Sequence, residues 1–199
     1  EILLKSGDVD GAEAMFKRLG DRYGDSMYSD AGPVGLGQVA LARGQNEEAL
    51  RIFEDALTNN PGMSKFKEAS LGKLEALAKL SKNDEAVTFA LQMVGDKTFR
   101  GETAGRAYLI LGGVYRKLAK DLTGSEAKDM LAKAHGTFQR VYIAYQGMPE
   151  ICAEGYWQAY ETARDLNDAV LAGETLQTLK NHPKLQNTAR VKGLAKPAR

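Results

Sequence analysis

The chain reads Leu-Gly-Gln-Val-Ala-Leu-Ala-Arg-Gly-Gln-Asn-Glu-Glu-Ala-Leu-Arg-Ile-Phe from residue 36 to residue 53, and this stretch decides its fold. Glycine accepts the left-handed conformation that ends a helix, and Asn with acidic residues favours the start of the next one. Gly44 therefore marks a turn between two helices. The apolar residues after the turn recur at helical spacing and predict one apolar face that ends at residues 59–62 (Ala49, Leu50, Phe53, Ala56, Leu57).

The same turn recurs along the chain, which predicts a repeat protein. Residues 7–12, 44–49 and 81–86 each place a polar cluster between a glycine or serine and an alanine. Asn167 and Asp168 mark a further turn near the end of the chain. The helix before each turn is expected to contain small residues, which let a neighbouring helix come close.

Residues 30–61 resemble the tetratricopeptide repeat, because six of its eight signature places are filled (Leu36, Gly37, Ala49, Phe53, Ala56, Pro61). Pro33 and Ala40 stand where the pattern has Trp and Tyr. The resemblance implies an all-α chain, folded as a right-handed α-α superhelix of helical hairpins. It covers residues 1–183, as four to five units of which the first is truncated to the end of a helix at residues 2–6.

The later units follow the pattern less closely. The third is identified mainly by its turn, and the fifth follows residues 148–150. In the fourth, about ten extra residues lie between the helices, a departure from the family spacing of about 34. We expect a break at residues 123–126, with Ser125 as the N-cap of a long helix that ends near Tyr145. Tyr156, Tyr160 and Ala163 are expected to face inward. The other residues that follow the repeat pattern in these units are Leu74, Leu77, Leu80, Ala86, Ala90, Met93, Leu111, Gly112, Tyr115, Ala134, Phe138, Val141, Ala172, Leu176 and Leu179.

Residues 184–199 form a basic tail, in which residues 187–196 are expected to form a short capping helix. The chain has a formal net charge of +1, but five basic residues follow Pro183 without an acidic one (Lys184, Arg190, Lys192, Lys196, Arg199). The rest of the chain carries 22 basic and 26 acidic residues. This distribution does not predict nucleic-acid binding, which usually needs a concentrated basic face.

No pattern in the chain predicts catalysis, a cofactor or a metal site. Residues 35–40 imitate a dinucleotide fingerprint, but they lie inside a repeat helix without a preceding strand. His135, Cys152 and His182 lack the spacing of zinc ligands, and Asp8 and Asp10 lack the later ligands of a calcium loop. The apolar runs are only a few residues long, whereas a membrane span needs about 20.

The predicted binding surface follows from the resemblance, since the first helix of each hairpin lines the concave groove in this family. In the second and third units that lining would be Val34, Gln38, Leu41, Glu68, Leu71, Glu75 and Lys79; Val34 and Gln38 replace the Lys and Asn of chaperone-binding members. The sharpest candidates are Arg106, Leu109, Ile110, Gly113, Arg116 and Lys117 in the fourth unit, and Trp157, Gln158, Glu161 and Arg164 in the fifth. Three cations beside two aliphatic side chains suit an acidic and apolar ligand. The alternative is that Trp157 packs internally and the cations are solvated.

We therefore expect a non-catalytic scaffold or adaptor that holds a protein or peptide partner. The family's use in bacterial envelope machines suggests a bacterial protein of the cell envelope or periplasm, with the cytoplasm left open. Two other interpretations remain: self-association into homo-oligomers, and an accessory domain of a larger enzyme.

Overall fold

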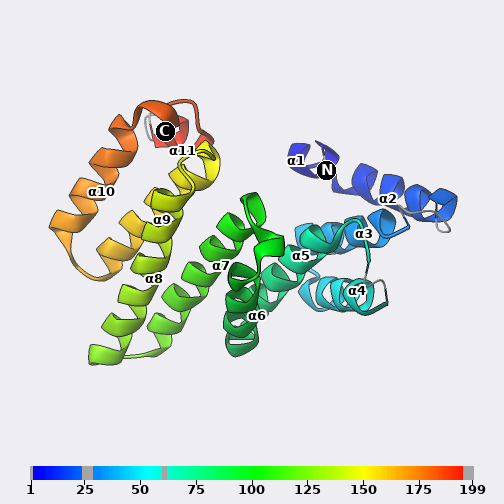
Figure 1. The fold of residues 1–199 in the computed structure, drawn as a ribbon, viewed down its shortest axis with the longest axis horizontal. Helices are drawn as coiled ribbons and strands as arrows, with labels where there is room; N and C mark the ends of the chain where they lie inside the picture. Colours follow the sequence, from blue (N-terminus) through cyan, green and yellow to red (C-terminus); the bar gives the residue numbers. More distant parts are fainter. Residues whose placement is uncertain (1, 24–28, 60–61, 195–199) are drawn as a thin grey trace. The chain divides into compact units, whose positions relative to one another are not determined.

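The computed structural model describes residues 2–23, 29–59 and 62–194, and every regular element in those ranges is a helix (Figure 1). The predicted helix stop at Asn60 and Pro61 lies outside the described residues, as do Lys196 and Arg199 in the basic tail. The chain divides into two compact units, Glu1–Ala86 and Val87–Arg199. Each unit is described by itself.

In the first unit, the first five helices form a series in which each packs on the next. It contains α1 (Ile2–Ser6), α2 (Val9–Tyr23), α3 (Ala31–Ala42), α4 (Asn46–Asn59), α5 (Phe66–Lys79) and the start of α6 (Asn83–Gly95). Helix α3 contacts α2 and α4, and α5 contacts both α4 and α3. Contacts between consecutive helices and between alternate helices are the packing pattern of a helical repeat.

The second unit continues the same pattern. It contains the rest of α6, η1 (Lys97–Phe99), α7 (Glu102–Leu118), η2 (Ala119–Asp121), α8 (Gly124–Ala144), α9 (Pro149–Asp165), α10 (Ala169–Asn181), η3 (Pro183–Leu185) and α11 (Ala189–Leu194). Helix α9 packs on α8 and α10, and it also contacts α7, the first helix of the preceding hairpin. Helices α7 and α9 therefore lie side by side within this unit.

The predicted turns share one backbone geometry. A residue with positive φ follows each of the helices concerned: Gly7 (85°), Gly44 (74°), Ser81 (60°) and Asn167 (58°). The next amide donates a hydrogen bond to the carbonyl five residues earlier, as from Gln45 to Ala40 at 2.9 Å and from Lys82 to Leu77 at 3.0 Å. This is the Schellman arrangement, which satisfies carbonyls that a helix end leaves unpaired. The prediction of helix-to-helix turns at these places is confirmed.

Fully buried phenylalanines on the second helix of a hairpin pack against glycines on the first. Phe53 is 0% exposed, and a Cβ atom added to Gly37 would lie 2.6 Å from its ring. Gly72 of the following hairpin also approaches Phe53, and Phe138 occupies the same relation to Gly112. The spacing of glycine and phenylalanine in the sequence therefore reflects direct contact between helices.

The fourth unit is expanded by longer helices, and the prediction of about ten extra residues between them is wrong: α7 ends at Leu118, η2 follows directly, and α8 begins at Gly124. Helix α8 has 21 residues, and its end at Ala144 confirms the predicted long helix. Ser125 as its N-cap is wrong: α8 begins at Gly124 and the N-cap is Thr123, which makes no side-chain cap hydrogen bond. Ser125 therefore lies inside the first turn, after Gly124, whose φ of 61° is a conformation that glycine adopts readily.

A short helix forms where the capping helix is predicted. Helix α11 spans Ala189–Leu194, and Leu185 just before it is 0% exposed. Both α11 and η3 contact α9. Within the described ranges, no helix combines the length and apolar character needed to span a bilayer.

Candidate functional site

All ten residues predicted to bind a partner lie on α7 or α9, which contact one another. We call their side chains the α7/α9 face. Arg106, Gly113 and Arg164 are exposed. The other seven are partly buried (Leu109, Ile110, Arg116, Lys117, Trp157, Gln158, Glu161). The structure thus places the fourth-unit and fifth-unit candidates on neighbouring helices of one compact unit.

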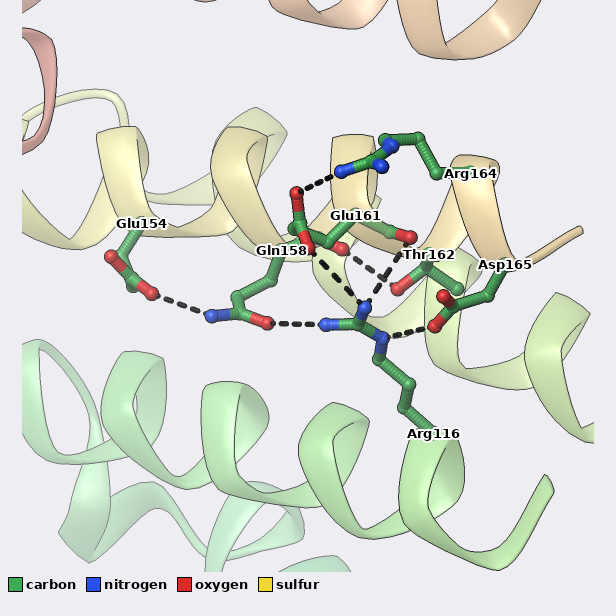
Figure 2. Close-up of polar contacts among 7 residues, drawn as sticks. All are labelled: Arg116, Glu154, Gln158, Glu161, Thr162, Arg164 and Asp165. Atoms are coloured by element: carbon green, nitrogen blue, oxygen red, sulfur yellow. Dashed lines mark hydrogen bonds and ion pairs between the residues drawn. The ribbon is translucent and has the colours of Figure 1, made fainter. Parts of the chain in front are cut away.

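Arg116 ties α7 to α9 through its whole guanidinium group (Figure 2). Its Nε donates to Asp165 Oδ2 at 2.5 Å, and its Nη2 lies 3.5 Å from Glu161 Oε2. Its Nη1 also donates to Gln158 Oε1 at 3.4 Å. The Arg116 side chain is 22% exposed, so these contacts hold a largely covered cation between two carboxylates.

The polar contacts continue along α9 to α11. The Gln158 amide donates to Glu154 Oε1 at 2.7 Å, as Figure 2 shows, and Glu154 Oε2 accepts from Arg190 at 2.6 and 3.0 Å. Arg190 also lies over the Trp157 ring, with its guanidinium carbon 4.8 Å from the ring centroid. One chain of contacts therefore joins side chains of α7, α9 and α11.

Three members of this network were not among the predicted site residues: Glu154, Asp165 and Arg190. A signal for the first two was present, because Glu154, Gln158, Glu161 and Asp165 follow the three- and four-residue spacing of one helix face. Arg190 gave no such signal, since its contact with Glu154 joins residues 36 positions apart.

The apolar candidates are engaged with the interior. Leu109 packs against the buried cluster of Ala134, Phe138 and Ala159. Trp157 packs against the cluster that contains Leu179 and Leu185, and its ring lies 5.2 Å from that of Tyr160. The exposed parts of these side chains are therefore held in place by their buried parts, which limits the entropy lost when a ligand binds.

The charges of the α7/α9 face are largely paired within the chain. Arg106 forms an ion pair with Glu102 at 2.6 Å, and Arg164 with Glu161 at 3.3 Å. Together with the Arg116 contacts, these pairs give the face mixed rather than purely positive charge. An acidic ligand would have to compete with Asp165 and Glu161 for Arg116.

Cys152 and His135, two of the residues considered for catalysis or metal binding, are buried and partly buried respectively. Cys152 is 0% exposed and its thiol donates to the Tyr142 carbonyl at 3.6 Å; burial raises the pKa of this thiol. Burial lowers the pKa of His135, although the charge of Asp168 opposes this shift. In the part of the chain that the structure describes, no three His, Cys, Asp or Glu side chains are grouped as metal ligands.

Comparison with known proteins identifies the fold. No protein-family model and no curated protein matches the chain. Among solved structures, the chain is similar to TTC0263, a thermophilic TPR protein of Thermus thermophilus, with 21% identity and a TM-score of 0.62. That match covers 83% of this chain and 80% of the other. A second similar structure is BtubC from P. vanneervenii, with 13% identity, coverage of 97% and 93%, and a TM-score of 0.43. The likeness to the TPR protein shows that this chain has the tetratricopeptide-repeat fold.

Proposed function

We propose that this chain, which has the tetratricopeptide-repeat fold, is a non-catalytic scaffold or adaptor that holds a segment of a partner protein on the α7/α9 face. The fold supports a general role in protein interaction, since stacked hairpins present extended surfaces made from neighbouring helices. A bacterial envelope assembly is our expectation for its setting.

The observation that carries the proposal is the fixed arrangement of Trp157, Gln158 and Arg116. These residues lie on α7 and α9, the first helices of two consecutive hairpins. Gln158 is held from both sides, by Arg116 at 3.4 Å and Glu154 at 2.7 Å. Aromatic and arginine side chains that are partly buried and already positioned are typical of binding hot spots. A ligand that contacts Arg116 and Gln158 would meet side chains that are already ordered.

The α7 part of the face suits an acidic and apolar segment. Arg106 is exposed there, and Leu109 and Ile110 are partly buried beside it in the helix. The Glu102 partner of Arg106 lies on the same helix and both side chains are more than half exposed, so their pairing is weak and exchangeable. A ligand carboxylate can therefore replace Glu102 at little cost.

The test is selection of a random peptide library on the immobilised chain, compared with two variants. The face variant combines Arg106→Glu with Arg164→Glu, because both side chains are exposed and lie on α7 and α9. The control combines Lys128→Glu with Lys133→Glu, two exposed positions on α8 with the same total change of charge. Circular dichroism melting curves establish that all three proteins are folded.

Acidic, apolar peptides enriched on the parent and on the control with both α8 lysines reversed, but not on the face variant, would support the proposal. Peptides that bind all three proteins equally, or no enrichment on any of them, would refute binding at this face. Arg116→Glu is unsuitable as a face variant, because a third carboxylate beside Asp165 and Glu161 would disturb the packing of α7 on α9.

Self-association is a second candidate, favoured by the distribution of charge. Residues 1–86 carry 15 acidic and 11 basic side chains, whereas residues 87–199 carry 11 acidic and 16 basic ones. Opposite net charges on two parts of a chain promote contact between copies. Light scattering over a range of protein and salt concentrations tests this, and a constant monomer mass at low salt would exclude it.

A further inference from the structure

Residues 183–194, which we call the strap, fold back onto α9. Leu185 is 0% exposed and Val191 is 8% exposed, and both belong to one buried cluster with Cys152, Ala153 and Leu179. Trp157 and Leu194 pack against the same cluster. Figure 1 shows α11 at the end of the unit where α9 begins and α10 ends. The strap therefore covers part of α9 that includes Trp157.

The polar contacts of the strap form a specific clamp. Glu154 Oε2 accepts from Nε and Nη2 of Arg190 at 3.0 and 2.6 Å, while the guanidinium lies over Trp157 at 4.8 Å. The Ala189 amide at the start of α11 donates to the Glu150 carboxylate at 3.2 Å. An ion pair with two donors and an aromatic ring beneath the cation recognise arginine better than lysine.

The charges of the two sides are complementary. The strap contains Lys184, Arg190 and Lys192 and no acidic residue, whereas the facing part of α9 supplies Glu150 and Glu154. The Arg190 and Glu154 side chains are 34% and 31% exposed, so solvent still reaches the clamp. A partly hydrated pair on a six-residue helix is a contact that another segment can replace.

We propose that the strap is an internal ligand that closes the Trp157 part of the α7/α9 face. A partner that displaces it presents the same chemistry, a short helix with an arginine next to aliphatic side chains. This arginine-bearing segment would bind the α9 part of the face beside Trp157, whereas the acidic segment of the proposed function binds the α7 part. That the displacing segment belongs to a partner protein rests on the proposed function, whereas the exchange of the strap does not. A partner binds the open form only. Its apparent affinity is therefore its affinity for the open form multiplied by the fraction of molecules in which the strap is open.

The experiment uses the whole chain and a fluorescent synthetic peptide of residues 183–194 as the probe. Arg190→Glu places a carboxylate against Glu154 and weakens the strap of the protein. Lys192→Glu is the matched control, because Lys192 is exposed on the same helix and the charge change is equal. Peptide binding is measured by fluorescence anisotropy, and hydrogen exchange of residues 183–194 reports whether the strap opens.

We expect the Arg190→Glu protein to bind the peptide about tenfold more tightly than the parent and the Lys192→Glu control. Adding Trp157→Ala should abolish this gain. Equal binding of the peptide by the Arg190→Glu and Lys192→Glu proteins would overturn the proposal. A peptide with the Arg190→Glu change that binds the Arg190→Glu protein as tightly as the unchanged peptide would also overturn it. The milder Arg190→Gln variant serves the same comparison if the charge reversal impairs folding.

The two proposals fail in different ways. Library peptides that bind the α7/α9 face without any gain for the strap peptide would reject the strap as a ligand and keep the proposed function. A gain for the strap peptide without library binding would keep the strap as an exchangeable ligand and reject the acidic partner.

Discussion

At the scale of single residues, two adjacent glycines in α7 have opposite surroundings. A Cβ atom at Gly112 would lie 2.5 Å from the Phe138 ring, which is 0% exposed. Gly113 is exposed, and a Cβ atom there would meet no atom within 4 Å. Packing against Phe138 therefore requires glycine at position 112, whereas position 113 has room for a larger side chain.

We predict that Gly112→Ala lowers the free energy of unfolding by about 1–3 kcal/mol, because overpacking displaces the Phe138 ring. Gly113→Ala should raise it by about 0.5–1 kcal/mol, since alanine is the better helix former. Urea unfolding followed by circular dichroism checks both values. Equal effects of the two substitutions would contradict the packing of α7 on α8.

Single residues also show what the sequence could predict about the site. The pairing of Gly112 with Phe138 could be anticipated, because repeat spacing fixes which positions meet between the two helices of a hairpin. The partners of Arg116 could not, since several carboxylates on α9 lie within reach of a long side chain. Periodicity assigns a residue to a helix face, but it does not choose among side-chain rotamers.

At the scale of elements, the turns differ in the residue that takes the left-handed conformation. Ser81 adopts φ 60° and Asn167 adopts φ 58°, where Gly7 and Gly44 stand in the other two turns. This conformation costs a residue with a Cβ atom about 1–2 kcal/mol, whereas glycine loses more entropy on folding, about 0.5–1 kcal/mol. Asn tolerates it better than Ser.

We predict that Ser81→Gly stabilises the chain by about 0.5 kcal/mol and that Asn167→Gly changes its stability less. Gly44→Ala, the reverse type of change, should destabilise by about 1 kcal/mol or more. Thermal and urea unfolding of the three variants give the comparison. If Ser81→Gly were destabilising, the serine side chain would have to contribute to the turn.

The elements were predictable to different degrees. Helix positions and turns followed from the sequence pattern, because glycine or asparagine next to a polar cluster at fixed spacing allows the backbone few conformations. The start of α8 was missed by two residues, because Thr123 is the N-cap in place of Ser125 and both residue types are acceptable N-caps. The α11 part of the strap was predicted as a helix, within residues 187–196, but its clamp on Glu154 depends on contacts between residues distant in the sequence.

At the scale of the whole molecule, the repeat architecture limits how far a local lesion spreads. Consecutive helices contact one another from α1 to α5 within residues 1–86, and from α7 to α10 within residues 87–199. The stability of such an array is approximately a sum of hairpin and nearest-neighbour terms. Hydrogen exchange can therefore show which helices a substitution destabilises, whereas a global unfolding curve reports only the average over the chain.

Two equivalent substitutions, one in each compact unit, provide a reciprocal test. Gly37→Ala pushes a Cβ atom against Phe53 in the first unit, and Gly112→Ala does so against Phe138 in the second. We predict that Gly37→Ala accelerates amide exchange in α3, α4 and α5 and leaves α9 and α10 close to their parent rates. Gly112→Ala should accelerate exchange in α7, α8 and α9 and spare α3 and α4, because coupling fades with each intervening hairpin. Mass spectrometry of peptides from both proteins measures this directly. Equal acceleration along the whole chain by either variant would mean that the two units unfold as one cooperative body.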